Sequence, residues 1–221
     1  MFVGHYAVSL VVKQMDRRLS LGWLFLAVQF VDILFFPLVL LGVERLNVVP
    51  NFTAATHFEL VYMPFTHSLL ASFFWAILVY GVVLRFFGRR RSFYSVTAFV
   101  LALAVISHWF LDLLVHTPDL PLLGDGSLKV GLGLWNHAGA TYLLEAGLLL
   151  LGLFFYLRST RGVGCVGRYG MILFVVFLLL VNAHNIFGPP MGRSVVALSV
   201  SALISYFGFA GVAFWLDRYR Y

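Results

Sequence analysis

The stretch SHWFLDLLVHTPDLP, residues 107–121, closes a segment that is apolar enough to cross a membrane. His108, Asp112 and His116 recur in it at intervals of four residues, which places their side chains on one face of an α-helix. Ionisable side chains are costly in contact with lipid, so this face is expected to point inward and to mark a functional site. Two imidazoles and a carboxylate are also common ligands of zinc and similar ions. The alternative is a packed polar contact between helices, with His116 at the water interface.

The amino-acid composition is that of a polytopic membrane protein. Of the 221 residues, 62% are hydrophobic and 11% are charged, which is too apolar for a soluble core of this size. A net charge of +6 would suggest a nucleic-acid partner in a soluble protein, but here it reflects where basic residues lie relative to the spans. We therefore expect no nucleic-acid partner. The single cysteine, Cys165, excludes an intrachain disulfide and a cysteine-based zinc site.

The hydropathy pattern predicts an all-α fold, with about six membrane-spanning helices in one integral membrane domain, residues 1–221. The predicted spans are residues 21–43, 67–87, 93–115, 133–157, 170–187 and 195–216. The apolar segment 1–12 reaches only ~18 Å as a helix, against ~30 Å of hydrocarbon, so it is expected to enter the membrane without crossing it. Residues 47–65 are expected to form a loop. The sequence shows neither an internal repeat nor a broken central helix pair.

The basic residues divide unevenly between the two ends of these spans. One end carries Lys13, Arg17, Arg18, Arg85, Arg89, Arg90, Arg91, Arg158, Arg161, Arg168, Arg218 and Arg220, and the other carries Arg45, Lys129 and Arg193. By the positive-inside rule, this asymmetry predicts that both termini are cytoplasmic. All seven histidines then lie at or beyond the membrane midplane, and His5 does so only if segment 1–12 rises from the cytoplasmic side.

Two other spans offer candidate ligands at a similar depth. Asp32 lies near the middle of the first span, where an unpaired carboxylate costs at least ~2.5–3.5 kcal/mol. It therefore needs a partner, and the structural alternative to a ligand role is a hydrogen bond from the protonated carboxyl to Gln29 or to a neighbouring span. His67 is expected to begin the second span, with Thr66 as the N-cap in the structural alternative. The positive end of the helix dipole disfavours imidazolium there, which leaves the neutral ring that a metal needs.

The fourth span carries His137, Thr141 and Glu145 on one face. Glu145 lies deep enough to need a partner, and we count it among the candidate catalytic residues. His116 and His137, at the outer rim, are expected to shuttle protons, because an unperturbed imidazole titrates near pH ~6.5. Several further polar residues are expected to be solvated or simply packed: His57, Glu59, Asp119, Asp125 and His184.

Four segments together resemble a known family. GHYAVS (residues 4–9), FVDILFFP (30–37), THSLL (66–70) and SHWFLDLLVHTPDLP (107–121) are similar to the LexA-regulated, membrane-bound metal-dependent hydrolase (YdjM-like) family. That family presents an N-terminal His, a Pro-Asp-x-Asp acid, a Thr-His-Ser motif and a His-x-x-x-Asp pair in the same order. The resemblance covers roughly residues 1–135, and LKVGLGLWN (128–136) is also similar to uncharacterised bacterial integral membrane proteins.

The resemblance implies five metal ligands: His5, Asp32, His67, His108 and Asp112. The chain departs from the family pattern at Asp32, which stands alone and lacks the preceding proline. The number of metal ions therefore stays open.

These observations favour a membrane-embedded hydrolase that uses a divalent metal, zinc or manganese. The expected substrate is a lipid or lipid-linked (phospho)ester near the outer leaflet, because a site at this depth is reached more easily from the bilayer than from water. Asp112, His116, His137 and Glu145 are the candidate catalytic residues. One alternative is a haem-binding or electron-transfer protein, in which the acids Asp32 and Asp112 would have no evident role. The other is a proton-linked transporter, against which the lack of a repeat or broken helix pair argues.

Overall fold

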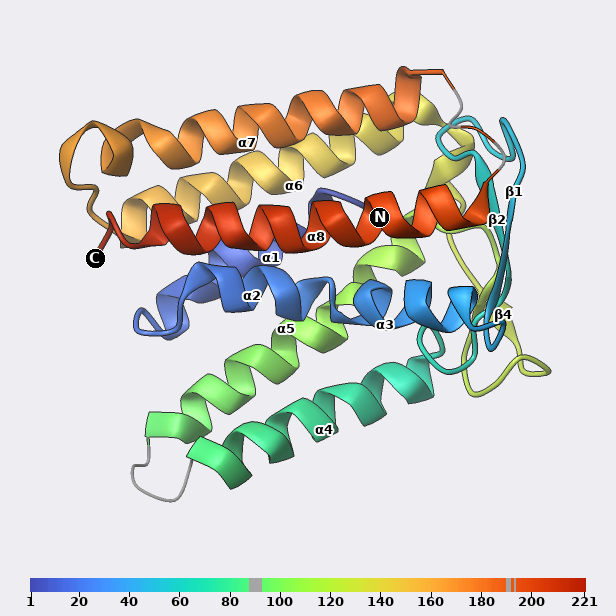
Figure 1. Ribbon diagram of the computed structural model, residues 1–221, viewed down its shortest axis with the longest axis horizontal. Helices are drawn as coiled ribbons and strands as arrows, with labels where there is room; N and C mark the ends of the chain where they lie inside the picture. Colours follow the sequence, from blue (N-terminus) through green and yellow to red (C-terminus); the bar gives the residue numbers. More distant parts are fainter. Residues whose placement is uncertain (88–92, 190–191, 193) are drawn as a thin grey trace.

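The computed structural model describes residues 1–87, 93–189, 192 and 194–221, and the described part of the chain is an all-α bundle (Figure 1). The fold class predicted from the sequence is confirmed. The helices are α1 Gly4–Val12, α2 Leu21–Val28, α3 Phe30–Leu40, α4 Leu69–Phe87, α5 Phe93–Val115, α6 Ala138–Ser159, α7 Gly164–Phe187 and α8 Val195–Asp217. Helices α4 to α8 are each long and apolar enough to cross a membrane. The protein is therefore built as an integral membrane protein.

The first predicted span is bent rather than straight. Helices α2 and α3 meet at Gln29 at an angle of 52°. They are long and apolar enough to cross a membrane only when they are taken together. This corrects the expectation that the chain contains no broken helix pair. The side chain of Gln29 turns away from the helix and donates from Nε2 to the carbonyl of Phe2 at 3.3 Å. The break places Asp32 in the first turn of a new helix, α3.

The helix bounds differ from the prediction in three other places. The segment 47–65, expected to be a loop, contains most of an antiparallel hairpin formed by β1 Arg45–Val48 and β2 Phe58–Tyr62. Helix α6 begins at Ala138 rather than near 133, because a second small pair, β3 Leu120–Pro121 with β4 Lys129–Val130, and a short 3-10 turn precede it. Helix α7 begins six residues earlier than predicted, at Gly164.

The short helix α1 lies inside the bundle, between α6, α2 and α5. It packs closely on α6, since a Cβ atom at Gly152 would lie only 2.8 Å from the carbonyl oxygen of Ala7. At its far end Lys13 is buried and donates from Nζ to Asp217 Oδ2 at 2.7 Å. Tyr156 donates its hydroxyl to the other oxygen of Asp217 at 3.0 Å. Helix α1 therefore runs from the middle of the bundle to the end that carries the C-terminus (Figure 1).

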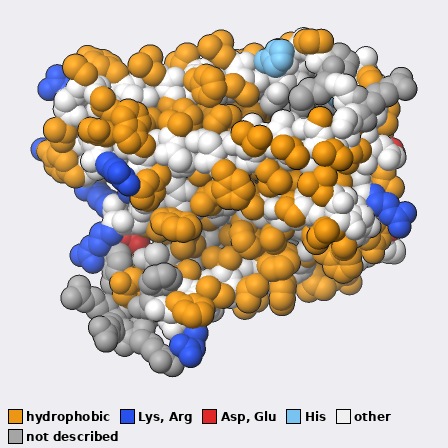
Figure 2. Space-filling view, viewed as in Figure 1, with side chains coloured by type: hydrophobic (Ala, Val, Ile, Leu, Met, Phe, Trp, Pro, Cys, Tyr) orange, Lys and Arg blue, Asp and Glu red, His pale blue; other side chains and the backbone are white. Residues whose placement is uncertain are grey.

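The charge distribution follows this axis. Figure 2 shows a largely hydrophobic face, with basic side chains gathered at the end that carries the C-terminus. The opposite end carries both small hairpins (Figure 1). Four of the basic residues used to predict orientation lie outside the described residues: Arg89, Arg90, Arg91 and Arg193.

Candidate metal centre

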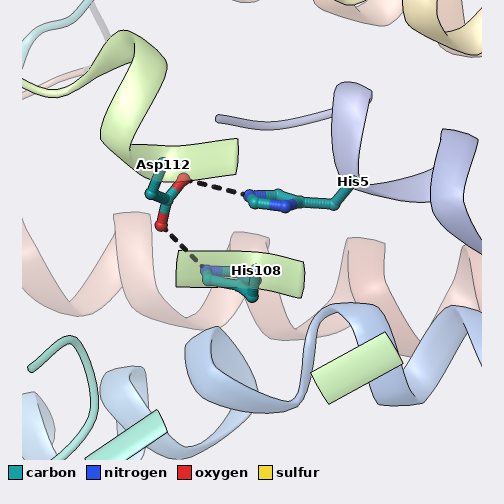
Figure 3. Close-up of side chains that lie close together, drawn as sticks. All are labelled: His5, His108 and Asp112. Carbon is teal, nitrogen blue, oxygen red and sulfur yellow. Dashed lines mark hydrogen bonds and ion pairs between the residues drawn. The ribbon is translucent and has the colours of Figure 1, made fainter. Parts of the chain in front are cut away.

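Asp112 lies at the centre of a buried polar cluster. Its Oδ1 is 3.1 Å from His5 Nε2 of α1, and its Oδ2 is 3.1 Å from His108 Nε2, one turn earlier on α5 (Figure 3). The rings of His5 and His108 are stacked, with centroids 3.9 Å apart and planes at 4°. His116 Nε2, one turn later, is 3.6 Å from Oδ2. The α-amino group of Met1 also lies 2.5 Å from Oδ1. The predicted stripe on α5 therefore faces the interior, where α1 meets it.

Asp32 brings a second carboxylate to the same place. Its Oδ1 is 3.2 Å from His67 Nε2 and 3.7 Å from His108 Nε2. Its Oδ2 accepts a hydrogen bond from the hydroxyl of Tyr206, on α8, at 2.9 Å. His67 Nε2 lies 4.0 Å from Asp112 Oδ2, so the two carboxylates share their imidazole neighbours. Among the described residues, two groups of three possible ligands result: His5, His108, Asp112 and Asp32, His67, His108.

The hydrogen bonds of His108 fix which nitrogen carries its proton. Nδ1 lies 2.7 Å from the carbonyl oxygen of Val28, the last residue of α2. A carbonyl only accepts, so Nδ1 carries the hydrogen and the neutral ring has its lone pair on Nε2. That Nε2 is buried and has no hydrogen-bond partner among the described residues. A metal-ligating histidine has this same arrangement, with its other nitrogen donating to a carbonyl or carboxylate.

His116 and His67 are oriented in the same way from two different loops. His116 Nδ1 lies 2.8 Å from Asp119 Oδ1, and burial lowers the pKa of His116 below its usual range. His67 Nδ1 lies 2.8 Å from Thr66 Oγ1, and that hydroxyl donates to Glu44 Oε2 at 2.7 Å. While Glu44 is ionised, Thr66 must therefore accept from His67 Nδ1–H. In both neutral rings the Nε2 lone pair is left to point at the carboxylates.

Glu44 holds the segment that precedes α4. Its Oε1 accepts hydrogen bonds from the backbone N–H groups of Phe65 at 2.9 Å and Thr66 at 3.1 Å. Burial raises the pKa of the Glu44 carboxyl above its usual range. Helix α4 begins only at Leu69, so His67 precedes the helix and Thr66 is not its N-cap. This corrects the expectation that His67 opens the span: Glu44, not a helix end, positions its ring.

The donor set fits a divalent ion. Ligand atoms bound at ~2.0–2.2 Å from one ion lie at most ~4.4 Å apart. The distances from the Nε2 atoms of His5, His67 and His108 to the oxygens of Asp32 and Asp112 range from 3.1 to 4.0 Å, so these side chains need only small movements to share an ion. The carboxylates of buried Asp112 and partly buried Asp32 face these lone pairs, and a divalent ion would add its positive charge to that of the Met1 α-ammonium beside Asp112. His5, Asp32, His67, His108 and Asp112 are the residues that would hold it.

The remaining two sequence-predicted site residues lie apart from this centre. Glu145 is buried, and its Oε2 accepts hydrogen bonds from the backbone N–H groups of Phe2 and Gly4, both at 3.0 Å. It therefore anchors the start of α1. His137 is exposed at the N-terminus of α6, and it is not among the described residues that line the cavity beside the centre, which is described below.

Sequence reasoning missed four side chains that support the centre: Glu44, Thr66, Asp119 and Tyr206. Of these, Asp119 had a sequence signal, because it follows His116 by three residues, but its position in a loop suggested ordinary solvation. Tyr206 is 174 residues from its partner Asp32, and nothing in the local sequence relates the two.

A cavity of about 310 Å³ adjoins the centre. Asp32, His67 and Asp112 lie in its wall together with His116. The rest of the lining comes from α3, the β1–β2 hairpin, α6, α7 and α8, and it is mostly apolar. The cavity would bring a ligand into contact with the polar cluster.

Comparisons of this chain with models of protein families, with curated proteins and with solved structures found no match.

Proposed function

We propose that this protein is a membrane-embedded, metal-dependent hydrolase that acts on a lipid or a lipid-linked (phospho)ester. The observation that carries the proposal is the convergence of buried imidazole Nε2 atoms on two carboxylates, the buried Asp112 and the partly buried Asp32. The order of the motifs, which resembles the LexA-regulated, membrane-bound metal-dependent hydrolase family, supports the same conclusion. Zinc or manganese suits a set of imidazoles and carboxylates.

The residues divide the chemical work between them. A bound divalent ion would polarise the ester and lower the pKa of a water molecule toward ~7. Asp112 and Asp32 hold the ligand rings in place and balance the added positive charge. His116, oriented by Asp119, is the group placed to accept the proton of the attacking water. The water oxygen bonds to phosphorus or to the acyl carbon, the ester bond breaks, and the leaving alkoxide takes the proton from His116.

The surroundings of the centre favour a substrate with an apolar part. Phe35 and Phe36 of α3 line the cavity, as do Leu198 and Ala202 of α8. These residues lie in segments that are apolar enough to cross a membrane. A lipid chain can therefore lie against them while its ester reaches the polar cluster. The asymmetry of the basic residues supports cytoplasmic termini, and the resemblance to a bacterial family supports a location in the bacterial inner membrane.

A carrier is the second candidate, and the bend between α2 and α3 is the observation that favours it. Broken helices with an acid beside the break are typical of ion-coupled transport sites, and Asp32 lies three residues after Gln29. A haem site is less well supported. The stacked rings of His5 and His108 are only 3.9 Å apart, which leaves no space for a porphyrin between them.

The proposal is tested with purified protein in detergent micelles, with zinc or manganese added. The substrates are mixed phospholipids, isoprenyl pyrophosphates and lipid esters, and the products measured are head group, phosphate and fatty acid. We expect hydrolysis that a chelator abolishes. Asp112→Asn should abolish the activity, and Asp125→Asn is its matched control, because Asp125 is a partly exposed acid that is paired with Lys129 and belongs to neither group of possible ligands. Bound metal without turnover of any of these substrates would favour the carrier instead.

A further inference from the structure

We propose that the cavity beside the metal centre binds the uncharged polar head of its lipid substrate through hydroxyl or amide groups, with Asn182 and His57 as the recognition residues. The inference rests on the proposed function, because it names the substrate class of the same site. It is carried by two polar side chains that line the cavity and lack partners within the described part of the protein.

Asn182 lies on α7, well away from the metal cluster in sequence. Its side chain is 1% exposed and lines the cavity. Neither Nδ2 nor Oδ1 has a hydrogen-bond partner among the described residues. Buried polar groups are nearly always hydrogen-bonded, because an unpaired one forfeits its hydration without compensation. The pair of free atoms on Asn182 therefore indicates a ligand that both donates and accepts.

His57 supplies the second free group, from the loop between β1 and β2. Its Nδ1 accepts a hydrogen bond from the backbone N–H of Asn51 at 3.0 Å. The neutral ring therefore carries its hydrogen on Nε2, which is buried without a partner among the described residues, and His57 lines the same cavity as Asn182. The sequence suggested that His57 is solvated, because it lies in an outer loop. The hairpin instead folds back so that its ring meets the cavity.

The hydrogen-bonding capacity of Asn182 and His57 distinguishes between the possible lipid head groups. A hydroxyl or an amide both donates and accepts, so it satisfies Asn182 and His57 together. A phosphate oxygen only accepts, so it would leave Asn182 Oδ1 unpaired. The buried carboxylate of Glu145 lines the same cavity and disfavours an anion at that side. The phosphoester or ester itself would lie at the metal centre, and the hydroxyl-bearing head would lie beyond it.

The size of the cavity agrees with a head group rather than a whole lipid. Its volume of about 310 Å³ is at the lower end of the ~300–1,000 Å³ found for ligand pockets. The chain of the lipid would leave along Phe35, Phe36 and Leu198, which line the cavity between α3 and α8.

Binding is measured with a chelator present, so that the result depends neither on metal nor on turnover. The protein is placed in phosphatidylcholine nanodiscs and titrated with four probes that share a ten-carbon chain. Decyl glucoside carries sugar hydroxyls, monodecanoylglycerol carries glycerol hydroxyls, decyl phosphate is anionic and decyltrimethylammonium is cationic. The signal is the fluorescence of Trp135, which lines the cavity and whose ring centroid lies 4.1 Å from that of His116. The Trp135→Phe variant gives the background from the other tryptophans.

We expect one or both hydroxyl probes to bind most tightly, and the difference between them identifies a sugar or a glycerol head. Asn182→Leu should weaken that binding about 10-fold, because a buried hydrogen-bonding partner is lost, and should change decyl phosphate binding less than ~2-fold. His57→Phe should act in the same direction. Asn47→Leu, an identical change at an exposed position on β1, should leave binding unchanged.

The thermal stability of the ligand-free Asn182→Leu variant shows whether Asn182 recognises the ligand or supports the fold. Replacing an unpaired buried amide by leucine removes a desolvated group, so Asn182→Leu should raise the thermal midpoint of the ligand-free protein. A lower midpoint with unchanged probe affinity would overturn the proposal, and so would tightest binding of decyl phosphate. If Asn182→Leu does not fold, Asn182→Ala is measured against the same criteria. If the wild-type protein neither binds metal nor hydrolyses a lipid but still binds the hydroxyl probes, the proposed function is refuted, and only the binding of the head group by Asn182 and His57 stands.

Discussion

His108 Nε2 lies 3.1 Å from Asp112 Oδ2, and the hydrogen of that ring is on the other nitrogen, facing the carbonyl of Val28. A lone pair and a carboxylate oxygen at this distance repel each other unless a cation lies between or beside them. Burial strengthens that repulsion, because both side chains are almost fully removed from solvent. The α-ammonium of Met1, 2.5 Å from Asp112 Oδ1, supplies one such positive charge, and a divalent ion shared by His108 and Asp112 would supply more.

Removing either member of this pair should remove the metal. We expect His108→Ala and Asp112→Asn to lower the stoichiometric zinc or manganese of the purified protein, because each residue belongs to a group of possible ligands. Elemental analysis of protein purified without chelator provides the measurement. Asp125→Asn should retain the wild-type metal content. Unchanged metal in both ligand variants would make the cluster a structural contact between α1 and α5.

The residues behind the ligands should also tune affinity. Thr66→Val removes the hydroxyl that links His67 to Glu44, so we expect metal affinity to fall ~10–100-fold. Competition with a fluorescent chelator measures it. Thr97→Val makes the same chemical change at the basic end of the bundle, where Thr97 contacts Asp16, and should leave affinity unchanged. Equal affinities in the two variants would count against the orienting role of Thr66.

Much of the fold and part of the centre are predictable because they depend on local pattern. The four-residue spacing of His108, Asp112 and His116 fixes their common face on any helix, and the apolar composition fixes the class of fold. His5 could be placed only conditionally, because its depth depends on how α1 is inserted. The structure resolves that condition by packing α1 on α6 with His5 against Asp112.

The rest depends on contacts between segments far apart in the chain. Gln29, at the bend, donates a hydrogen bond to the carbonyl of Phe2, and the pairing of Asp32 with Tyr206 joins α3 to α8. Neither partner leaves a periodic signal in the sequence. The partners of Glu145 are backbone N–H groups, which sequence reasoning about side chains does not consider.

The buried ion pair at the basic end should be a major determinant of stability. Asp217 accepts from Lys13, from Tyr156 and from the backbone of Leu21, so Asp217→Ala would leave a buried ammonium without its counter-ion. We expect the free energy of unfolding to fall by about 3–5 kcal/mol. Asp125→Ala, at a partly exposed pair, should cost less than about 1 kcal/mol. Denaturant titration in mixed micelles measures both, and equal costs would contradict the argument.

Orientation is tested by the accessibility of single cysteines in whole cells. In a Cys165→Ser background, a cysteine at position 51 or 126 should react with an impermeant reagent from outside, because both positions lie at the end that carries the hairpins. The native Cys165 is exposed at the opposite end, so in the wild-type protein it should react only after the inner face is opened. The reverse pattern would place the metal centre nearer the inner leaflet.

The rate of hydrolysis should distinguish a metal ligand, Asp112, from a proton shuttle, His116. Asp112 contacts several rings of the cluster, so Asp112→Asn should lower kcat at least ~100-fold through loss of metal and of orientation together. His116→Ala should lower kcat less than Asp112→Asn does, because it removes only the acid–base contribution, part of which solvent can replace. His137→Ala should be close to wild type, since His137 is exposed and outside the described cavity lining. Hydrolysis rates measured across pH for the three variants provide the comparison. A loss in His137→Ala as large as that in His116→Ala would show that the proton leaves through α6 instead, and full activity in Asp112→Asn would remove that carboxylate from the mechanism.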